Sequence, residues 1–412
     1  MIEKPQGPGV SNLAARRGEE LTLEFMSSCE TALLAQYDRF ELYGALCKQS
    51  GVHRDDLSTA VRNRDLARVP SIPTGLFKRS KSLLADLNDL EQPDGTWTAS
   101  SSTSGDPSYV LRSDDDLRIM LESYLAAYSK TPGTDLTLVL SPSHTFATSK
   151  NVVRRLELDD GRRALPQYAV PLRGAESHFH DLRYVVRIDM LRTLSNMIVG
   201  NRRPVFRTES RTALRKLLAK AKRNGLSVTL CPNVLLLYPA VMRYDIGELE
   251  LGDRAFVLTG AGGWGGKKGI FNGEPIDKRT YVADLCTRLG IPRGMAKERF
   301  FDIYAFTENH AAHFGSWSDD LSDFVFETAG DTVVYAMNPQ TGKPVGPGEV
   351  GMFSVISPAG CERTAGVCVV QDDLVKVIDS YRDGSVKRFT GVRRTESSAG
   401  ASAGCAYSMD GD

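Results

Sequence analysis

The sequence predicts an α/β fold, with a large body of layered, largely parallel sheets followed by a small β-rich subdomain. Short apolar runs alternate with amphipathic helical stretches up to about residue 330. Because parallel strands need helix-sized connections, this alternation favours parallel pairing. After about Asp331, β-rich runs follow one another with Gly and Pro turns between them. The chain of 412 residues is long enough for two or three domains.

Four regions are expected in chain order. They are a helical N-terminal cap at 1–75, an α/β body at 76–330, the β-rich subdomain at 331–393 and a flexible C-terminal arm at 394–412. Apolar residues at helical spacing between Glu19 and Lys48 indicate the cap. Residues 397–404 are only Ser, Ala and Gly, a composition typical of a flexible arm, and Cys405 follows directly.

Local signals predict the individual elements. Ser113 followed by Asp116 resembles a capping box, so a helix is expected to begin there. Another helix is expected from Asp277 to Leu289, where Gly290 stops it. The remaining expected elements are a helix capped by Thr208 and strands at Leu136–Leu140, Leu226–Cys231, Ala255–Leu258, Phe300–Tyr304, Thr332–Met337, Val350–Ile356, Val367–Val370, Leu374–Ile378 and Ser385–Phe389.

Composition argues against several classes of partner and compartment. Lys plus Arg and Asp plus Glu balance at 51 each, so no overall charge favours nucleic acid or an anionic membrane. The longest apolar run, Val234–Met242, is far shorter than a bilayer span. Seven scattered cysteines without C-x-x-C spacing argue against a disulfide framework and favour a reducing cytoplasm. The basic residues between Arg215 and Arg223 are expected to form a solvated helix face.

A hydroxyl-rich stretch at 98–108 is the first candidate site. Five consecutive hydroxyl residues, Ser100 to Ser104, end on Gly105. Short side chains leave backbone N–H groups uncovered and hydroxyls add donors, so such a loop can wrap a polyphosphate. The alternative is a solvated linker.

A glycine-rich stretch at 258–268 follows an expected strand. It nearly fits the phosphate loop of kinases, but Ala261 stands where the first glycine belongs and Lys268 where Ser or Thr belongs. A phosphate loop of that type is therefore not favoured. Gly262 and Gly263 would instead let a flat base approach the backbone, or they belong to a plain mobile loop.

Two further stretches carry carboxylates. Thr307 and Glu308 follow the expected strand Phe300–Tyr304, at the end where ligands of α/β sheets bind. Thr307 would hold a phosphate oxygen and Glu308 would hold Mg²⁺, unless they simply cap a helix. Asp373 has the chemistry to chelate two ribose hydroxyls, with an Arg supplied by the stretch around Arg393. The alternative for this last set is a turn-rich hairpin.

Cys405 is the candidate nucleophile, because its glycine-rich polar neighbours offer no hydrophobic pattern that would bury it. Two histidine pairs are weaker candidates for metal binding. His178 and His180 would share a strand face and His310 and His313 a helix face, but neither pair has a recognisable third ligand. The G-x-S-x-G match at 400–404 lies in the Ser, Ala and Gly stretch and not between a strand and a helix, so a Ser-His-Asp hydrolase is not favoured.

In combination these stretches resemble the adenylate-forming ligases, and more closely the LuxE acyl-protein synthetases of bacterial luciferase operons. The resemblance extends from about Val69 to the C-terminus. It rests on an ordered series of motifs: residues 72–78, 100–105, 304–308 and 342–351, then Asp373, Arg393 and Cys405. Departures from the family pattern are Ser102 and Ala305 in place of glycines, Ala403 in place of an arginine, and Val392 between Gly391 and Arg393. The full C-terminal lid of ordinary adenylating ligases, with its catalytic lysine, is not expected here.

The resemblance implies a two-step reaction. ATP and Mg²⁺ convert a carboxylic acid, for example a fatty acid, to an acyl-adenylate, and Cys405 then takes the acyl group as a thioester for a LuxC-like acyl reductase. The implied phosphate ligands are Ser100, Ser101, Thr103, Ser104 and Gly105; Ala261, Gly262 and Gly263 flank the adenine; Tyr304, Thr307, Glu308, Asp373 and Arg393 complete the site, with Glu308 on the metal. Two rival hypotheses remain: a ligase that passes the adenylate to a free amine or CoA, and a non-catalytic nucleotide-binding scaffold.

Overall fold

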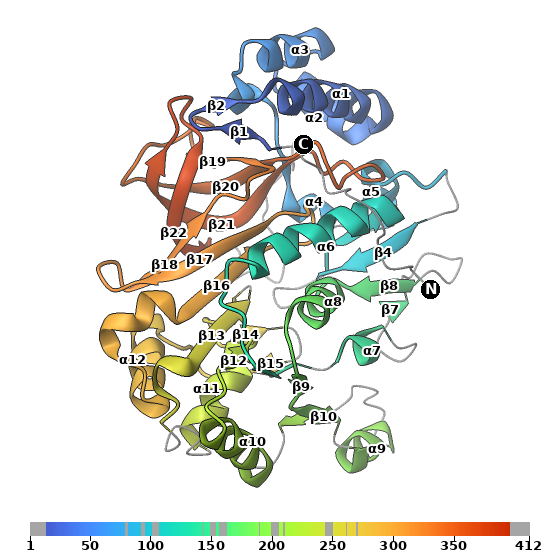
Figure 1. The fold of residues 1–412 in the computed structure, drawn as a ribbon. Helices are drawn as coiled ribbons and strands as arrows, with labels where there is room; N and C mark the ends of the chain where they lie inside the picture. The colour runs from blue at the N-terminus through green and yellow to red at the C-terminus, as the bar shows by residue number, and fades with distance from the viewer. Residues whose placement is uncertain are drawn as a thin grey trace.

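The computed structural model describes residues 14–78, 81–91, 95–100, 107–141, 143–148, 154–155, 163–188, 190–198, 206–208, 211–243, 250–260, 262–268 and 271–395. Within them, a mixed sheet of twelve strands runs through the molecule (Figure 1). Its strand order is β19-β20-β21-β22-β18-β17-β16-β13-β12-β6-β9, and β3 pairs with β21 off this path. The strands are β3 Ile72–Pro73, β6 Leu136–Val139, β9 Leu182–Tyr184, β12 Val228–Cys231, β13 Ala255–Gly260, β16 Phe300–Ala305, β17 Ala312–Ser318, β18 Asp323–Glu327, β19 Val333–Met337, β20 Val350–Ile356, β21 Cys368–Ser380 and β22 Val386–Arg394.

This sheet has a parallel half and an antiparallel half. The strands β9, β6, β12, β13 and β16 pair in parallel, and helices separate most of them in the chain. From β17 onward every neighbour along the path is antiparallel. The predicted α/β class is therefore confirmed. The sheet also crosses the expected boundary at residue 330 without a break, because β22 pairs with β18.

Smaller sheets and the helices surround this core. A four-stranded sheet has the order β5-β4-β8-β7, with β4 Thr96–Ala99, β5 Tyr109–Arg112, β7 Arg154–Arg155 and β8 Arg163–Pro166. Two-stranded ladders are β1 Arg16–Arg17 with β2 Glu20–Leu21, β10 Val186–Ile188 with β11 Phe206–Thr208, and β14 Lys267–Lys268 with β15 Phe271–Asn272. The helices are α1 Leu23–Arg39, α2 Glu41–Gln49, α3 Arg54–Arg62, α4 Thr74–Phe77, α5 Lys81–Leu87, α6 Asp114–Tyr128, α7 His144–Ala147, α8 Ala169–His178, α9 Met190–Ile198, α10 Arg211–Arg223, α11 Val234–Arg243 and α12 Lys278–Leu289.

Most predicted elements lie within a few residues of their expected positions. Ser113 and Asp116 form the capping box at the start of α6. Asp277 caps α12, and Gly290 ends it in the left-handed conformation that glycine adopts without strain. None of the described helices combines the length and hydrophobicity that crossing a bilayer requires.

The helical spacing between Glu19 and Lys48 falls on two helices, α1 and α2, which meet at Phe40. Other expectations differ from the structure. His178 ends helix α8, whereas a strand was expected there. Thr208 ends β11 and does not cap α10. The two strands expected between Val367 and Ile378 are one thirteen-residue strand, β21, whose register shifts absorb the break in pattern. His310 and His313 lie on a turn and on β17 instead of a helix, because the strand β16 reverses into β17 through residues 306–311.

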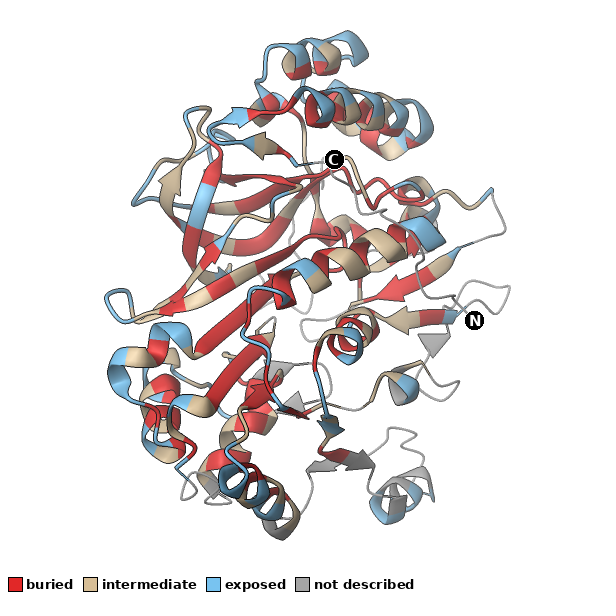
Figure 2. Ribbon diagram, in the orientation of Figure 1, coloured by how far each residue is buried: buried red, intermediate tan, exposed pale blue. Residues whose placement is uncertain are grey.

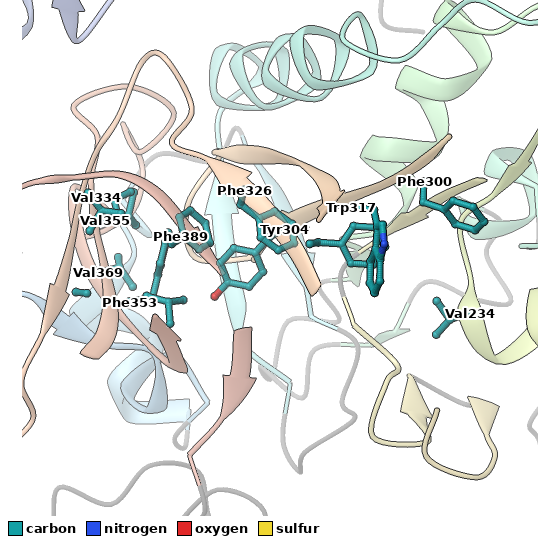
Figure 3. Packing of buried hydrophobic residues seen from close by; sticks show 14 of the residues in the cluster. Val234, Phe300, Tyr304, Trp317, Phe326, Val334, Phe353, Val355, Val369 and Phe389 are labelled. Atoms are coloured by element: carbon teal, nitrogen blue, oxygen red, sulfur yellow. The ribbon is translucent and has the colours of Figure 1, made fainter. Parts of the chain in front are cut away.

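An aromatic cluster packs the two halves of the sheet together (Figure 3). The Tyr304 ring lies 5.2 Å from Phe353 and 6.0 Å from both Phe326 and Phe389, measured between centroids. These residues come from β16, β20, β18 and β22, so strands from both halves meet around one ring. Figure 2 shows β16 and β20 as buried along most of their length, whereas buried positions on β18 and β22 are interspersed with more exposed ones. The cluster therefore fixes where the end of β16 lies relative to the antiparallel strands.

His313 is a titratable member of this cluster. Burial lowers the pKa of His313 to about 3, and its Nδ1 accepts a hydrogen bond from the Ala329 N–H at 3.0 Å. The folded state thus holds the ring neutral, whereas an unfolded chain protonates it below about pH 6.5. The stability that comes from this neutral ring is present above that pH and is lost as the pH falls towards the folded-state pKa.

We predict that His313→Asn flattens the acid limb of the stability profile. Between about pH 6.5 and 3, the parent histidine contributes a slope of up to about 1.4 kcal/mol per pH unit, which the non-titrating variant lacks. Urea unfolding at a series of pH values measures this slope. The exposed His53 supplies the control, His53→Asn, which should keep the parent's slope. Parallel profiles for the parent and His313→Asn would contradict the assignment.

Candidate active site

The carboxyl ends of β13 and β16 bring two predicted stretches to one edge of the sheet. These strands are parallel neighbours, with Gly260 opposite Ile303. The glycine-rich stretch that follows β13 and the Thr307–Glu308 turn that follows β16 therefore leave the sheet at the same edge. Gly262 and Gly263 have φ values of +86° and +97°, which side chains disfavour. Thr307 and Glu308 are both buried.

Tyr304 and Asp373 are in direct contact across the two halves of the sheet. The Tyr304 hydroxyl donates a hydrogen bond of 2.8 Å to Asp373 Oδ2, and both residues are buried. Burial, and then the adjacent carboxylate, raise the pKa of the Tyr304 hydroxyl well above its usual value, so this group remains a donor. Asp373, a residue of β21 that the sequence singled out, thus lies against Tyr304, three positions before Thr307.

Arg394 is the arginine that meets this carboxylate. Its Nε lies 3.1 Å from Asp373 Oδ1 and its Nη1 3.5 Å from Asp372 Oδ2. The Asp373 charge is the largest cause that raises the pKa of Arg394. Arg393, which the sequence placed here, pairs with Leu374 in the ladder and is exposed. Adjacent strand residues point to opposite faces, so a shift of one position changes the partner.

Asp372 connects the site to the segment around β3 and α4. Its carboxylate accepts hydrogen bonds from Thr74 Oγ1 at 2.8 Å and from Lys78 Nζ at 3.1 Å. The Lys78 side chain is 11% exposed, so this ion pair is largely removed from solvent screening. The motif at 72–78 is thereby joined to β21 by a charge-assisted contact.

A buried arginine holds the Thr307–Glu308 turn in place. Arg112, at the end of β5, is fully buried, and its guanidinium donates to the carbonyl oxygen of Thr307 at 2.6 Å and to that of Gly360. Burial lowers the pKa of Arg112 against the raising effect of Asp116 and Glu308. This one side chain therefore ties the four-stranded sheet to the end of β16 and to the turn at 357–366.

Glycines let the turn at 357–366 approach closely. A Cβ on Gly360 would come within 2.9 Å of the His310 side chain, and one on Gly366 within 2.8 Å of the Glu308 carbonyl oxygen. The Glu362 N–H also donates to Asp116 Oδ1 at 3.0 Å. The Thr307–Glu308 turn is thus enclosed by main chain on one side and by Arg112 on another.

The hydroxyl-rich stretch lies at the end of the β4–β5 hairpin. Ser100 closes its base: the Ser100 N–H donates to the Ser108 carbonyl oxygen at 3.0 Å, and Ser100 Oγ accepts from the Ser108 N–H at 2.9 Å. The other predicted ligands in this stretch, Ser101, Thr103, Ser104 and Gly105, lie outside the described residues, as do Ala261 and Cys405. Within the described chain, Arg112 is the link between this hairpin and the Thr307–Glu308 turn.

A family model matches this sequence over more than half its length. The model describes the LuxE acyl-protein synthetases and matches residues 193–412. The chain belongs to the LuxE acyl-protein synthetase family. The match includes Tyr304, Thr307, Glu308, Asp373 and Cys405, whereas the hydroxyl-rich stretch lies before it. No curated protein matches the sequence.

Solved structures extend the likeness to the whole fold of this LuxE-family chain. A 2-hydroxyisobutyryl-CoA ligase in the postadenylation state, in complex with R3-HIB-AMP, has a TM-score of 0.54 at 10% identity and covers 91% of this chain and 67% of its own. The same ligase in the thioesterification state, in complex with 2-HIB-AMP and CoA, has a TM-score of 0.53 at 12% identity and covers 89% and 67%. The fold is therefore that of the adenylate-forming ligases.

Four residues of the site were not predicted as functional: Arg112, Asp372, Lys78 and Arg394. A fully buried arginine has no sequence signal, because arginine is usually exposed. Lys78 lies in the stretch at 72–78 and Asp372 directly precedes Asp373, but their ion pair depends on the pairing of β3 with β21. The register of β21 with β22 sets Asp373 opposite Arg394 and would have identified the arginine that contacts this carboxylate.

The cysteines of the described residues are poor nucleophiles. All six are buried. Burial raises the pKa of Cys231 and Cys368 to about 12 and that of Cys47 and Cys286 to about 11. Cys361, in the turn next to Arg112, also has a pKa raised by burial. Because the thiolate is the reactive form, none of these side chains is suited to attack an acyl group.

We predict that Arg112→Met loosens both turns that the guanidinium contacts. The buried carbonyl oxygens of Thr307 and Gly360 would each lose a donor, at a cost of about 1–3 kcal/mol per group. Amide hydrogen exchange should therefore become faster at 307–312 and 360–366, with a lower free energy of unfolding in urea. Arg118→Met, on the more exposed face of α6, is the matched control. Unchanged exchange in both turns would refute the role of Arg112.

Proposed function

We propose that this chain uses ATP to activate a carboxylic acid, transfers the acyl group to its own Cys405 as a thioester, and delivers it to a partner acyl reductase. The observation that carries the proposal is the contact of Tyr304 with Asp373 beside the Thr307–Glu308 turn, inside the region that matches the LuxE family. This contact brings the carboxylate proposed to bind the ribose hydroxyls close to the turn that carries the proposed phosphate and Mg²⁺ ligands. The family supports the acyl-protein synthetase reaction, and the fold supports the adenylate step.

In the proposed first step, the substrate carboxylate attacks the α-phosphorus of ATP and pyrophosphate leaves. A carboxylate is a poor acyl donor because oxide is a very poor leaving group, whereas AMP is a good one. Thr307 would donate its hydroxyl to a phosphate oxygen, and Asp373 would accept hydrogen bonds from the ribose hydroxyls. Hydroxyls and N–H groups at 100–105 would stabilise the charge on the phosphates. Gly262, Gly263 and Ala261 would flank the base.

The chemistry of the donors fits a Mg²⁺ ion held mainly by the nucleotide. Among the described residues, no three His, Cys, Asp or Glu side chains form a metal-binding group. Glu308 is a buried carboxylate at the turn, and Mg²⁺ often takes one or two carboxylates together with phosphate oxygens and waters. When bound there, the ion would neutralise phosphate charge.

In the proposed second step, the Cys405 sulfur attacks the acyl carbonyl carbon, AMP leaves, and the thiol proton passes to solvent. The arm that carries this thiol starts at the site. Arg394 pairs with both aspartates, and the Thr395 N–H donates to the Asp372 carbonyl oxygen at 3.0 Å. Cys405 follows Arg393 by twelve positions, which gives a reach of roughly 40 Å when extended. Such a tether is long enough to collect an acyl group and present it to another protein.

The decisive experiment for the first step is carboxylate-dependent ATP–pyrophosphate exchange across a panel of acids that includes fatty acids of increasing length. We predict exchange with at least one acid. We also predict that Glu308→Gln lowers the exchange rate by about 10²- to 10³-fold, because phosphate charge loses a stabilising partner. Glu362→Gln, an exposed glutamate on the neighbouring turn, should retain the parent's rate. Absence of exchange with every acid would favour a non-catalytic nucleotide-binding scaffold.

The second step has its own test. We predict that Cys405→Ser abolishes covalent labelling by a radiolabelled acid in the presence of ATP but keeps pyrophosphate exchange, because only the thiol is lost. Cys286→Ser, which removes a buried thiol, should label like the parent. Full turnover of Cys405→Ser with CoA or a free amine would instead support a ligase in which Cys405 is a bystander.

A further inference from the structure

Helix α9 exposes a stripe of large aliphatic side chains. Leu191 is 81% exposed, Leu194 50% and Ile198 86%, and their spacing of three and four residues places them on one helix face. Isolated exposed leucines are ordinary, but three on one face of a nine-residue helix form a continuous apolar surface. Such a surface is the mark of an interaction site.

The position of α9 in the fold leaves this face open. The helix lies in the connection between β10 and β11, which pair with each other from Val186 to Ile188 and from Phe206 to Thr208. It projects at the end of the molecule that also carries α10 (Figure 1). Among the described residues, no helix or strand makes an extensive packing contact with α9. Figure 2 shows exposed positions along both helices.

The same stretch of chain is strongly basic. Residues 182–225 contain twelve Arg and Lys but two Asp and Glu, a net charge of +10. Because the whole chain is neutral, the remaining residues carry −10. On α10, Leu214, Leu218 and Ala221 are buried, while Lys216 and Lys220 are exposed on the opposite side. The balanced composition therefore hides a charge asymmetry along the chain, with positive charge concentrated in the stretch that contains α9 and α10.

We propose that α9 and α10 dock this protein on the surface of an anionic lipid bilayer. Leu191, Leu194 and Ile198 enter the boundary between headgroups and acyl chains, and the basic residues contact lipid phosphates. Aliphatic side chains flanked by Arg and Lys are typical of helices that lie in a membrane interface. The net negative remainder of the chain is repelled by the same surface, which orients the molecule with this end towards the lipid.

Two other occupants fit the surface less well. In a symmetric dimer through α9, two ends of charge +10 would face each other, and like charges oppose such an interface. A protein partner is usually anchored by Trp, Tyr or Arg, whereas the stripe on α9 consists of Leu and Ile. A bilayer needs no shape complementarity. If the proposed function is correct, docking would also bring the enzyme to a membrane pool of amphiphilic acids.

Flotation of the full chain with lipid vesicles tests the proposal directly, with no variant and no acid substrate. We predict binding to phosphatidylcholine vesicles that contain phosphatidylglycerol, and at least roughly tenfold weaker binding to phosphatidylcholine alone. Binding should fall sharply in about 1 M salt, where the Debye length is about 3 Å. Absence of binding to the anionic vesicles at low ionic strength would overturn the proposal.

Matched variants separate the two contributions. The double variant Leu191→Ser/Ile198→Ser should weaken binding about tenfold or more, whereas Leu23→Ser, at a site of similar exposure on α1, should not. Lys216→Glu/Lys220→Glu should weaken it similarly, whereas Arg68→Glu near the N-terminal helices should not. Equal weakening by the controls would refute a specific lipid-binding end.

Two further readouts complete the test. Light scattering reports the oligomeric state. If the parent is a dimer and Leu191→Ser/Ile198→Ser dissociates it, the occupant of the α9 surface is a second copy of the chain and not a bilayer. Pyrophosphate exchange with a water-soluble acid, together with circular dichroism, should be the same in these variants and the parent. Loss of lipid binding with retained exchange therefore tests the docking surface alone, and loss of exchange in the parent tests the proposed function alone.

Discussion

The buried guanidinium of Arg112 is the constraint on which the arrangement of the site depends. A charge in a fully buried position is costly unless it is hydrogen-bonded. Here the guanidinium donates hydrogen bonds to two main-chain carbonyl oxygens. Those carbonyls belong to turns more than fifty residues apart, so satisfying the charge requires both turns to be close together. The hydrogen bonds that satisfy the buried guanidinium therefore also fix the position of Thr307 and Glu308.

The α/β class, the capped helices and the strands were predictable because their signals are local. A capping box at Ser113 and a glycine at 290 depend on residues within a few positions. The continuity of the sheet across residue 330 was not predictable, because it depends on the pairing of β18 with β22 across sixty residues. Asp373 was proposed from the sequence alone, whereas its contact with Arg394 depends on the register between two strands.

The net charge of the whole chain does not show how charge is distributed along it. The equal numbers of acidic and basic residues argued against attraction to an anionic membrane, but that inference applies to a uniform distribution. With +10 collected in 44 residues and −10 in the rest, attraction and repulsion act on different parts of the chain. At physiological ionic strength the Debye length is about 8 Å, so each end responds to its own surroundings. The local distribution therefore decides the interaction.

The contacts of Arg394 also bear on the proposed transfer of the acyl group to Cys405. An acceptor thiol must reach an adenylate and then leave it, and ordinary flexible linkers lose effective concentration as they lengthen. Here β22 ends at the two aspartates, and the Thr395 N–H binds the Asp372 carbonyl. In the proposed transfer, the segment that leads to Cys405 therefore begins beside the proposed ribose site. Under that proposal, the short span from Arg394 to Cys405 favours a high effective concentration of the thiol at the site.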